Sequence, residues 1–396
     1  MALRVGTWRQ ARRAPTQREK TNGRRGEDDT RSRRSWRPPI ILVLAGQEIW
    51  IWFHDLRGHF FEETGRGVLL VSYSESMKWM RFIGVYEMNQ ATSSITDVRR
   101  LGYYIPQRDG TVDFAVHGKV ASADVLAELH EIISVVFNLQ PVIFAFDVVE
   151  KNYQELSTSL EAHLLQFNNL ATQNVVPISI GMDGLVLVAQ KVSNFLSSAS
   201  AFLAQTERQL RCVHGDDSPE LNMWNERRKN LHANSFSYRF LYELRNFAQH
   251  RSLPLSNFNI SGERSSKDAP MVFKTGALIL RDGLLEDGYD WKKLQVEIQK
   301  QPSEFKLLPL TTEYLHCLRQ LCLEAVKFQD ARLVECARYF GAVRRTLKIP
   351  VGAVPVIFVG ESTSKEIPPS RFEVIPMDQF AYLLQAYLQL IKVCET

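Results

Sequence analysis

Residues 236–250 read FSYRFLYELRNFAQH, and this stretch decides the predicted fold. On a helical wheel, at about 100° per residue, four apolar side chains fall within one narrow stripe: Phe236, Phe240, Leu244 and Phe247. The opposite face, here called the polar arc, consists of Arg245, Tyr238, Gln249, Tyr242, Asn246, Arg239, His250 and Glu243. The sequence therefore predicts a helix that packs on a core through one face and presents a solvated surface or a functional site on the other.

Long helices are also predicted before this segment. Helical patterns cover residues 150–173 and 184–213, with Asp183 as the N-cap of the second helix. Ser218-Pro219 opens a third helix that reaches His250, because proline is favoured at the first helical position. The second and third helices are joined by about five residues, so we expect them to pack antiparallel.

The C-terminal part alternates strands and helices. An insertion over residues 255–310 contains strands at residues 257–260 and 271–280. After it we predict a helix at residues 311–348, with Thr311 or Thr312 as its cap, a strand at residues 354–360 and a closing helix at residues 378–393. Residues 151–396 are therefore expected to form one helical domain with a strand-bearing insertion.

A small α/β domain is predicted at residues 80–150. Asp109-Gly110 is a hairpin signal between strands at residues 102–106 and 112–117. The other expected elements are a strand at residues 81–86, an amphipathic helix at residues 121–138 and a buried strand at residues 141–149. The fold class is thus α+β and predominantly α-helical, with a small N-terminal α/β unit.

The N-terminal region differs in composition from the rest. Residues 1–38 hold twelve basic and four acidic residues, so of the net charge of +4 this tail carries +8 and the remaining chain −4. Without apolar periodicity, residues 1–38 are predicted to be a disordered basic tail, with an RNA-binding arm as the alternative. Residues 39–79 are an uncertain segment, and we expect translation to begin naturally at Met77, Met80 or Met88.

Composition also indicates location. Hydrophobic residues make up 45% of the 396 residues, which is typical of soluble globular proteins and excludes a membrane transporter. The most hydrophobic stretch, residues 39–53, is too short to span a bilayer, which needs roughly 20 apolar residues. The five cysteines contain no CxxC pair and are typical of reduced thiols. We therefore predict a cytoplasmic protein without membrane association.

Several catalytic motifs are missing from the sequence. It contains no Walker A motif, no GxGxxG, no HExxH and no GxSxG, and it has no cysteine–histidine cluster. Neither a cofactor nor a metal ion is therefore expected. A metal-dependent nuclease or hydrolase that uses Asp287, Asp290 or Glu324 is a weak alternative, because these acids are scattered along the chain.

The polar arc contains residues suited to phosphodiester chemistry. Arg245 and His250 lie at positions i and i+5, roughly 140° apart around the helix axis. Asn246 is at i−4 from His250 and is expected to orient its imidazole, with Gln249 and Tyr242 as further supporting residues. Arginine binds phosphate oxygens bidentately, and histidine transfers protons near neutral pH. The arc therefore predicts a site for RNA, which supplies its own 2′-hydroxyl nucleophile.

Arg245-Asn246-Phe-Ala-Gln-His250 resembles the R-x4–6-H motif of the HEPN superfamily, which favours a polar residue after the arginine. The resemblance implies a helical bundle that forms a homodimer, in which motifs from two protomers face each other. It further implies a metal-independent endoribonuclease of phage defence, abortive infection or a toxin–antitoxin system, with an antitoxin protein as a further partner. Arg245 and His250 would then be the catalytic pair, and Asn246 the polar neighbour.

The pattern alone is common, and other interpretations stay open. Arg227 with His232 (x4) and Arg208 with His214 (x5) also match the R-x4–6-H pattern, but neither has a small polar residue after the arginine. The second functional hypothesis is a non-catalytic helical module that binds RNA or a protein partner. The structural alternative is that Arg245 and His250 only pack against the insertion at residues 255–310.

Overall fold

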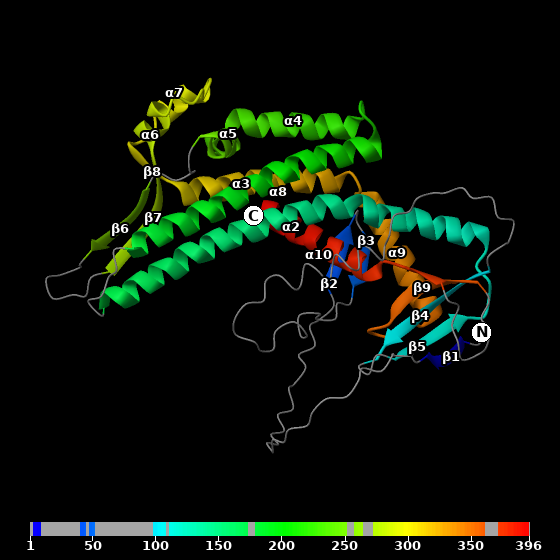
Figure 1. Ribbon diagram of the computed structural model, residues 1–396. Coiled ribbons are helices and arrows are strands. Elements are labelled where there is room, and N and C mark those ends of the chain that lie inside the picture. The colour runs from blue at the N-terminus through cyan, green and yellow to red at the C-terminus, as the bar shows by residue number, and fades with distance from the viewer. Residues whose placement is uncertain are drawn as a thin grey trace, which may run out of the picture. The chain divides into compact units, whose positions relative to one another are not determined.

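The computed structural model describes residues 3–8, 40–44, 47–51, 98–107, 111–172, 179–251, 257–263, 272–360 and 371–395 (Figure 1). The described part of the chain is mostly helical with small antiparallel sheets, which confirms the predicted α+β class. It divides into two compact units, one comprising Met1–Leu129 and Ala337–Met377, the other His130–Cys336 and Asp378–Thr396. This division differs from the boundary expected at residue 150.

The first unit is built on an antiparallel sheet with strand order β1-β5-β4-β9-β10, in which β1 (Leu3–Trp8) is an edge strand. β4 (Arg99–Pro106) and β5 (Val112–His117) form the predicted hairpin, with Gly102 opposite Val116. β9 (Val354–Val359) pairs with the other edge of β4, and β10 (Arg371–Val374) pairs with β9. The strand predicted at residues 354–360 is therefore correct, but it belongs to this unit and not to the helical domain.

The N-terminal region also contributes strands. β1 (Leu3–Trp8) pairs with β5, so the prediction of disorder throughout residues 1–38 is wrong for these six residues. The segment contains valine, threonine and tryptophan, which are residue types with a high strand propensity. In the segment at residues 39–79, β2 (Ile40–Leu44) and β3 (Gln47–Ile51) form an antiparallel hairpin. Residues 9–39 and the strand predicted at residues 81–86 lie outside the described residues.

α2 (Ala123–Thr172) replaces three predicted elements by one helix of 50 residues. The strand predicted at residues 141–149 is wrong, because Pro141 is accommodated inside the helix. The buried side chains of that run follow the helical period, at Val142, Ile143, Phe146 and Val149, whereas Val148 is 46% exposed. A helix that is apolar on its buried face and partly apolar outside gives a continuous hydrophobic run, which resembles a buried strand.

The same helix has the length and composition of a membrane span. Among the described residues, only Ala123–Leu170 meets this description, and 44% of its most apolar window is buried inside the protein. A core helix of a soluble protein has the same properties, so this is weak support for a membrane span. The fold is compatible with the predicted soluble protein.

The second unit contains the helices around the quoted stretch. α3 (Ser179–His214) begins before Asp183, which is therefore an exposed helical residue and not the predicted N-cap. Ser218 caps α4 (Pro219–Asn234) as predicted, since its hydroxyl accepts a hydrogen bond from the Leu221 N–H at 3.2 Å.

The predicted third helix is in fact two helices. Ser235 has extended backbone angles, φ −113° and ψ 119°, and separates α4 from α5 (Phe236–His250). Its hydroxyl accepts a hydrogen bond from the Tyr238 N–H at 3.1 Å, which satisfies one free donor of the new helix. Serine thus interrupts a hydrophobic pattern that continues across it.

The remaining helices complete this part of the chain. α8 (Leu307–Lys327) and α9 (Asp330–Leu347) divide the helix predicted at residues 311–348. Thr311 and Thr312 are not caps, because they lie inside α8 and donate to the Leu308 carbonyl. α10 (Met377–Glu395) matches the predicted closing helix. All five cysteines are free, and three of them are buried.

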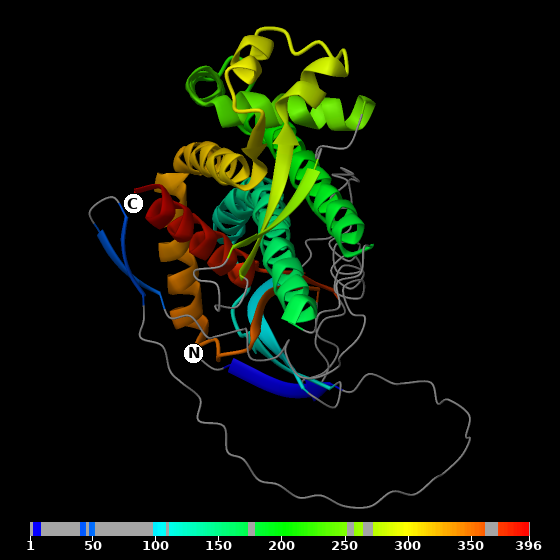
Figure 2. The same ribbon diagram turned by 90° about the vertical axis from the view of Figure 1, so that its left-hand side faces the viewer.

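The insertion forms a small subdomain. β6 (Asn257–Glu263), β7 (Val272–Leu280) and β8 (Glu304–Lys306) make a three-stranded antiparallel sheet, which confirms the two predicted strands. α6 (Arg281–Glu286) and α7 (Leu294–Gln299) lie between β7 and β8. Figure 2 shows these short yellow helices next to the green α4 and α5, and α7 contacts α5.

A close approach between α2 and α3 yields a testable prediction. His163 on α2 is 5% exposed, and a Cβ atom at Gly184 on α3 would lie 2.4 Å from its Nε2 atom. Gly184→Ala should therefore lower the free energy of unfolding by about 1–3 kcal/mol, although alanine is the better helix former by about 1 kcal/mol. Urea unfolding measures the change. Gly283→Ala, where the nearest atom is 3.8 Å away, is the control, and equal stability of both variants would contradict the prediction.

Candidate functional site

The apolar stripe of α5 forms the core contact that the sequence predicts. Phe240 and Leu244 have no exposed surface, and Phe247 is 3% exposed. Trp291 of the insertion stacks on Phe240 and Phe247, with ring centroids 5.9 Å and 5.3 Å apart. α5 is therefore fixed in place by its apolar face, with the insertion as part of its packing surface.

The polar arc is less continuous than predicted, because Tyr238 is only 1% exposed. Its ring packs edge-on against Tyr314 of α8, with centroids 5.3 Å apart. Burial raises the pKa of the Tyr238 hydroxyl well above its usual range. The neighbouring Ser237 is also buried, and its hydroxyl donates to a carboxylate oxygen of Glu313 at 2.7 Å. This part of α5 is a helix–helix contact.

The insertion occupies a second part of the arc. The Arg239 guanidinium donates to both carboxylate oxygens of Glu297 on α7, at 3.1 Å and 2.5 Å. Its Nη1 atom donates to the carbonyl of Ala233, at the end of α4. Glu243 accepts a hydrogen bond from the Tyr289 hydroxyl. Arg239 and Glu243 thus have structural roles that the wheel alone did not reveal.

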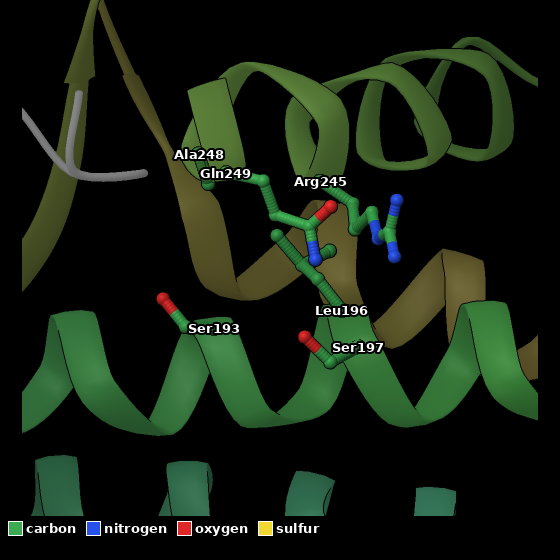
Figure 3. A pocket seen from close by; sticks show the side chains of 6 residues that line it. All are labelled: Ser193, Leu196, Ser197, Arg245, Ala248 and Gln249. Atoms are coloured by element: carbon green, nitrogen blue, oxygen red, sulfur yellow. The ribbon is translucent and has the colours of Figure 1, made fainter. Parts of the chain in front are cut away.

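Two other residues of the arc, Arg245 and Gln249, border a cavity of about 50 Å³ between α3 and α5, here called the α3–α5 cavity. Figure 3 shows its lining side chains, which are Ser193, Leu196 and Ser197 from α3 and Arg245, Ala248 and Gln249 from α5. Two of the predicted site residues, Arg245 and Gln249, therefore meet at one place.

Arg245 has an unusual environment for an arginine of this unit. Its Nη1 atom donates to the Asn246 side-chain oxygen at 3.2 Å. Its Nε atom is buried and donates to no acceptor among the described residues. Within that part of the chain Arg245 also forms no ion pair, whereas Arg239 and Arg319 each bind a glutamate. A guanidinium without a carboxylate partner retains its capacity to bind an anionic ligand.

His250 stands apart from this cluster. It is exposed in the last turn of α5 and is not among the residues that line the α3–α5 cavity. Asn246 does not orient it as predicted, because its oxygen accepts from Arg245 and its amide donates to Glu243 at 3.5 Å. One chain therefore brings together Arg245, Asn246 and Gln249, with His250 further around the helix.

Tyr242, the last supporting residue, is 45% exposed. Its ring is stacked parallel to that of Tyr238, with centroids 6.5 Å apart. It does not line the α3–α5 cavity. It presents an aromatic face at the surface, which is the kind of surface on which nucleic-acid bases stack.

The two other Arg–His patterns lie in different surroundings. Arg227 donates to the Gln320 side chain at 2.8 Å. Burial, followed by the charges of Arg239 and Arg228, lowers the pKa of His232. His214 lies 3.9 Å from Glu220. None of the four residues that form these two patterns lines the α3–α5 cavity.

A metal-binding cluster is not found in the described ranges. Among these residues no group of three or more histidine, cysteine or acidic side chains is placed to hold a metal ion. Asp287 and Asp290 follow α6, and Asp290 accepts a hydrogen bond from the Lys292 N–H at 3.0 Å. Glu324 lies on α8. The three acids of the metal-dependent alternative are therefore not gathered at one site.

Ser193 and Ser197 are cavity residues that could not be predicted from the sequence. They are one helical turn apart, and both face α5 across the cavity. Their i, i+4 spacing can be read from the sequence, but it indicates a site only when α3 is known to pack against α5. Comparison with known protein families, curated protein sequences and solved structures found no match for this chain.

Proposed function

We propose that this protein is a metal-independent endoribonuclease of HEPN type. In this proposal Arg245 binds the phosphate of the RNA and His250 transfers a proton. The chain would act in the cytoplasm as a homodimer that joins two such motifs. RNA is its substrate, and an antitoxin protein or a phage-defence context follows from the same resemblance. A single chain supplies half of this site.

The observation that supports the proposal most is that Arg245 has no carboxylate partner among the described residues. The guanidinium is half-buried beside the α3–α5 cavity, and no carboxylate within the described residues pairs with it. Buried or half-buried arginines normally find an acidic partner, because an uncompensated charge is costly. A phosphate oxygen of RNA would supply the missing negative charge.

The reaction needs only groups that RNA and these side chains provide. The 2′-hydroxyl oxygen attacks the adjacent phosphorus, and its proton passes to a base. The bond from phosphorus to the 5′-oxygen breaks, and that oxygen takes up a proton. The products are a 2′,3′-cyclic phosphate and a 5′-hydroxyl. Arg245 would stabilise the charge on the phosphorane, and His250 would act as general acid or base.

A non-catalytic binding module is the second candidate. The insertion binds two arc residues, Arg239 and Glu243, and His250 lies away from the cavity that Arg245 borders. Such a surface would bind RNA or a protein without cleaving it. The two candidates differ in one measurable respect, which is whether RNA is cut in a manner that depends on His250.

His250→Ala should lower RNA cleavage by about 100-fold or more, because general acid–base catalysis contributes at least that factor. The full-length protein and the variant are incubated with end-labelled tRNA and mRNA in EDTA, and the product ends are mapped. His232→Ala, at the second Arg–His pattern, is the matched control and should cleave normally. Cyclic phosphate ends from wild type and control alone would support the proposal. Full activity of His250→Ala would exclude it, and a folded wild type that binds but never cuts RNA would favour the binding module.

A further inference from the structure

Helix α3 contributes polar side chains to the cavity that Arg245 borders. Ser193 and Ser197 lie on the same face of α3, opposite Arg245 and Gln249 of α5 (Figure 3). The Ser193 hydroxyl donates to the Ala189 carbonyl at 2.9 Å, so the lone pairs on its oxygen remain to accept hydrogen bonds. Leu196 and Ala248 form apolar walls around these groups. The cavity thus combines an apolar lining with polar groups from both helices, of which Ser197 and Gln249 also reach the solvent.

The hydrogen-bond requirement of Arg245 matches these groups. Its buried Nε–H is a donor that meets no acceptor within the described residues. A buried donor of this kind is normally satisfied by the protein or by ordered water. A cavity of about 50 Å³ has room for water, which needs roughly 10–15 Å³ and two to four polar partners. The two serine hydroxyls and the Gln249 amide supply such partners.

The Gln249 side chain borders the cavity from α5. Figure 3 shows its side chain extending from α5 towards α3, with the amide between Ser197 and Arg245. An amide both accepts and donates hydrogen bonds, so one end can serve the guanidinium and the other a serine hydroxyl. Arg245 and Gln249 are at positions i and i+4 on α5 and are therefore neighbours on its surface.

We infer that Ser193 and Ser197 are positioning residues that hold Arg245 through Gln249 and water in the α3–α5 cavity. The network fixes the Nε side of the guanidinium, while Asn246 holds Nη1. The orientation of the remaining Nη2 atom is then fixed by the hydrogen bonds at Nε and at Nη1. The catalytic consequence of this network rests on the proposed ribonuclease function, whereas the network itself does not.

The network is tested first without RNA, by NMR of the arginine Nε–H groups in full-length protein labelled with ¹⁵N-arginine. Arg245→Lys identifies the Arg245 resonance. We expect slow exchange of this proton with solvent in the wild type, and exchange about tenfold faster in the double variant Ser193→Ala/Ser197→Ala. Ser198→Ala is the matched control, because this adjacent hydroxyl donates within α3 to the Phe195 carbonyl and does not line the cavity. Unchanged exchange in the double variant would overturn the inference.

Kinetics then separate positioning from binding. The double variant should cleave RNA with a kcat about tenfold lower and an unchanged KM, because a misplaced group costs rate and not affinity. Ser193→Thr/Ser197→Thr keeps both hydroxyls and should restore both the kcat and the slow exchange. A kcat equal to that of the wild type would overturn the positioning role. If no protein cleaves RNA but the Nε–H exchange responds as expected, the proposed function fails and the network stands.

Discussion

Arg245→Gln should lower the single-turnover rate of RNA cleavage by about 1000-fold, which is the usual cost of removing a group that stabilises charge in a transition state. Glutamine keeps a polar side chain beside the cavity but loses the positive charge. Arg245→Lys keeps the charge and loses both the planar fork and the Nε–H, so we expect it to recover only part of the rate. The comparison separates the contribution of charge from that of geometry.

The control for this experiment is Arg208→Gln. Arg208 is exposed on α3 and belongs to another Arg–His pattern, and its replacement removes the same charge. It should leave the rate close to that of the wild type, although RNA binding weakens slightly through the lost charge. Equal losses in both variants would mean that charge alone matters. Cleavage by Arg245→Gln at the wild-type rate would exclude Arg245 from the reaction.

The stability of Arg245→Gln should be almost unchanged. Arg245 forms no ion pair within the described residues, and its one hydrogen bond joins it to the adjacent Asn246. Replacing the guanidinium removes a buried Nε–H that has no acceptor among the described residues, so we expect the free energy of unfolding to change by less than about 1 kcal/mol. Activity and stability therefore separate at this position, as expected for a residue kept for binding and not for folding.

Features that depend on local pattern could be predicted from the sequence. The stripe of Phe240, Leu244 and Phe247 is buried as the helical wheel indicates. The Asp109-Gly110 hairpin signal in the sequence correctly predicts the pairing of β4 with β5. Both depend on neighbours only a few residues apart, and such patterns determine secondary structure with little influence from the rest of the chain.

Other features depend on distant segments. The pairing of β9 with β4 joins strands that are far apart in sequence, so strand 354–359 could be predicted but its sheet could not. The polar arc was incorrectly treated as one surface, because Glu297 and Tyr289 of the insertion bind Arg239 and Glu243. A helical wheel gives the direction in which a side chain points, but it does not show which distant segment packs against that side chain. For the same reason Ser193 and Ser197 carried no signal before α3 and α5 were seen to face each other.

Trp291→Ala should strongly destabilise the second unit. Trp291 is 1% exposed, stacks on Phe240 and Phe247, and donates from Nε1 to the Leu284 carbonyl at 3.0 Å. Truncation of a buried aromatic side chain costs about 3–5 kcal/mol, from the lost apolar burial and the cavity that remains. Urea unfolding of the full-length protein measures this loss. Val296→Ala, at a 56% exposed position on α7, is the control and should change the stability by less than about 0.5 kcal/mol.

The same variant shows how far the insertion and α5 depend on each other. If Trp291 mainly attaches the insertion, Trp291→Ala should make α6 and α7 sensitive to protease before α3 and α5. Arg239 would then lose Glu297, and Glu243 would lose Tyr289, so the polar arc would become more open to ligands. If Trp291 instead supports α5 itself, the slow exchange of the Arg245 Nε–H should be lost together with the insertion. A loss of unfolding free energy below about 1 kcal/mol would contradict both cases, because truncating a buried tryptophan normally costs about 3–5 kcal/mol.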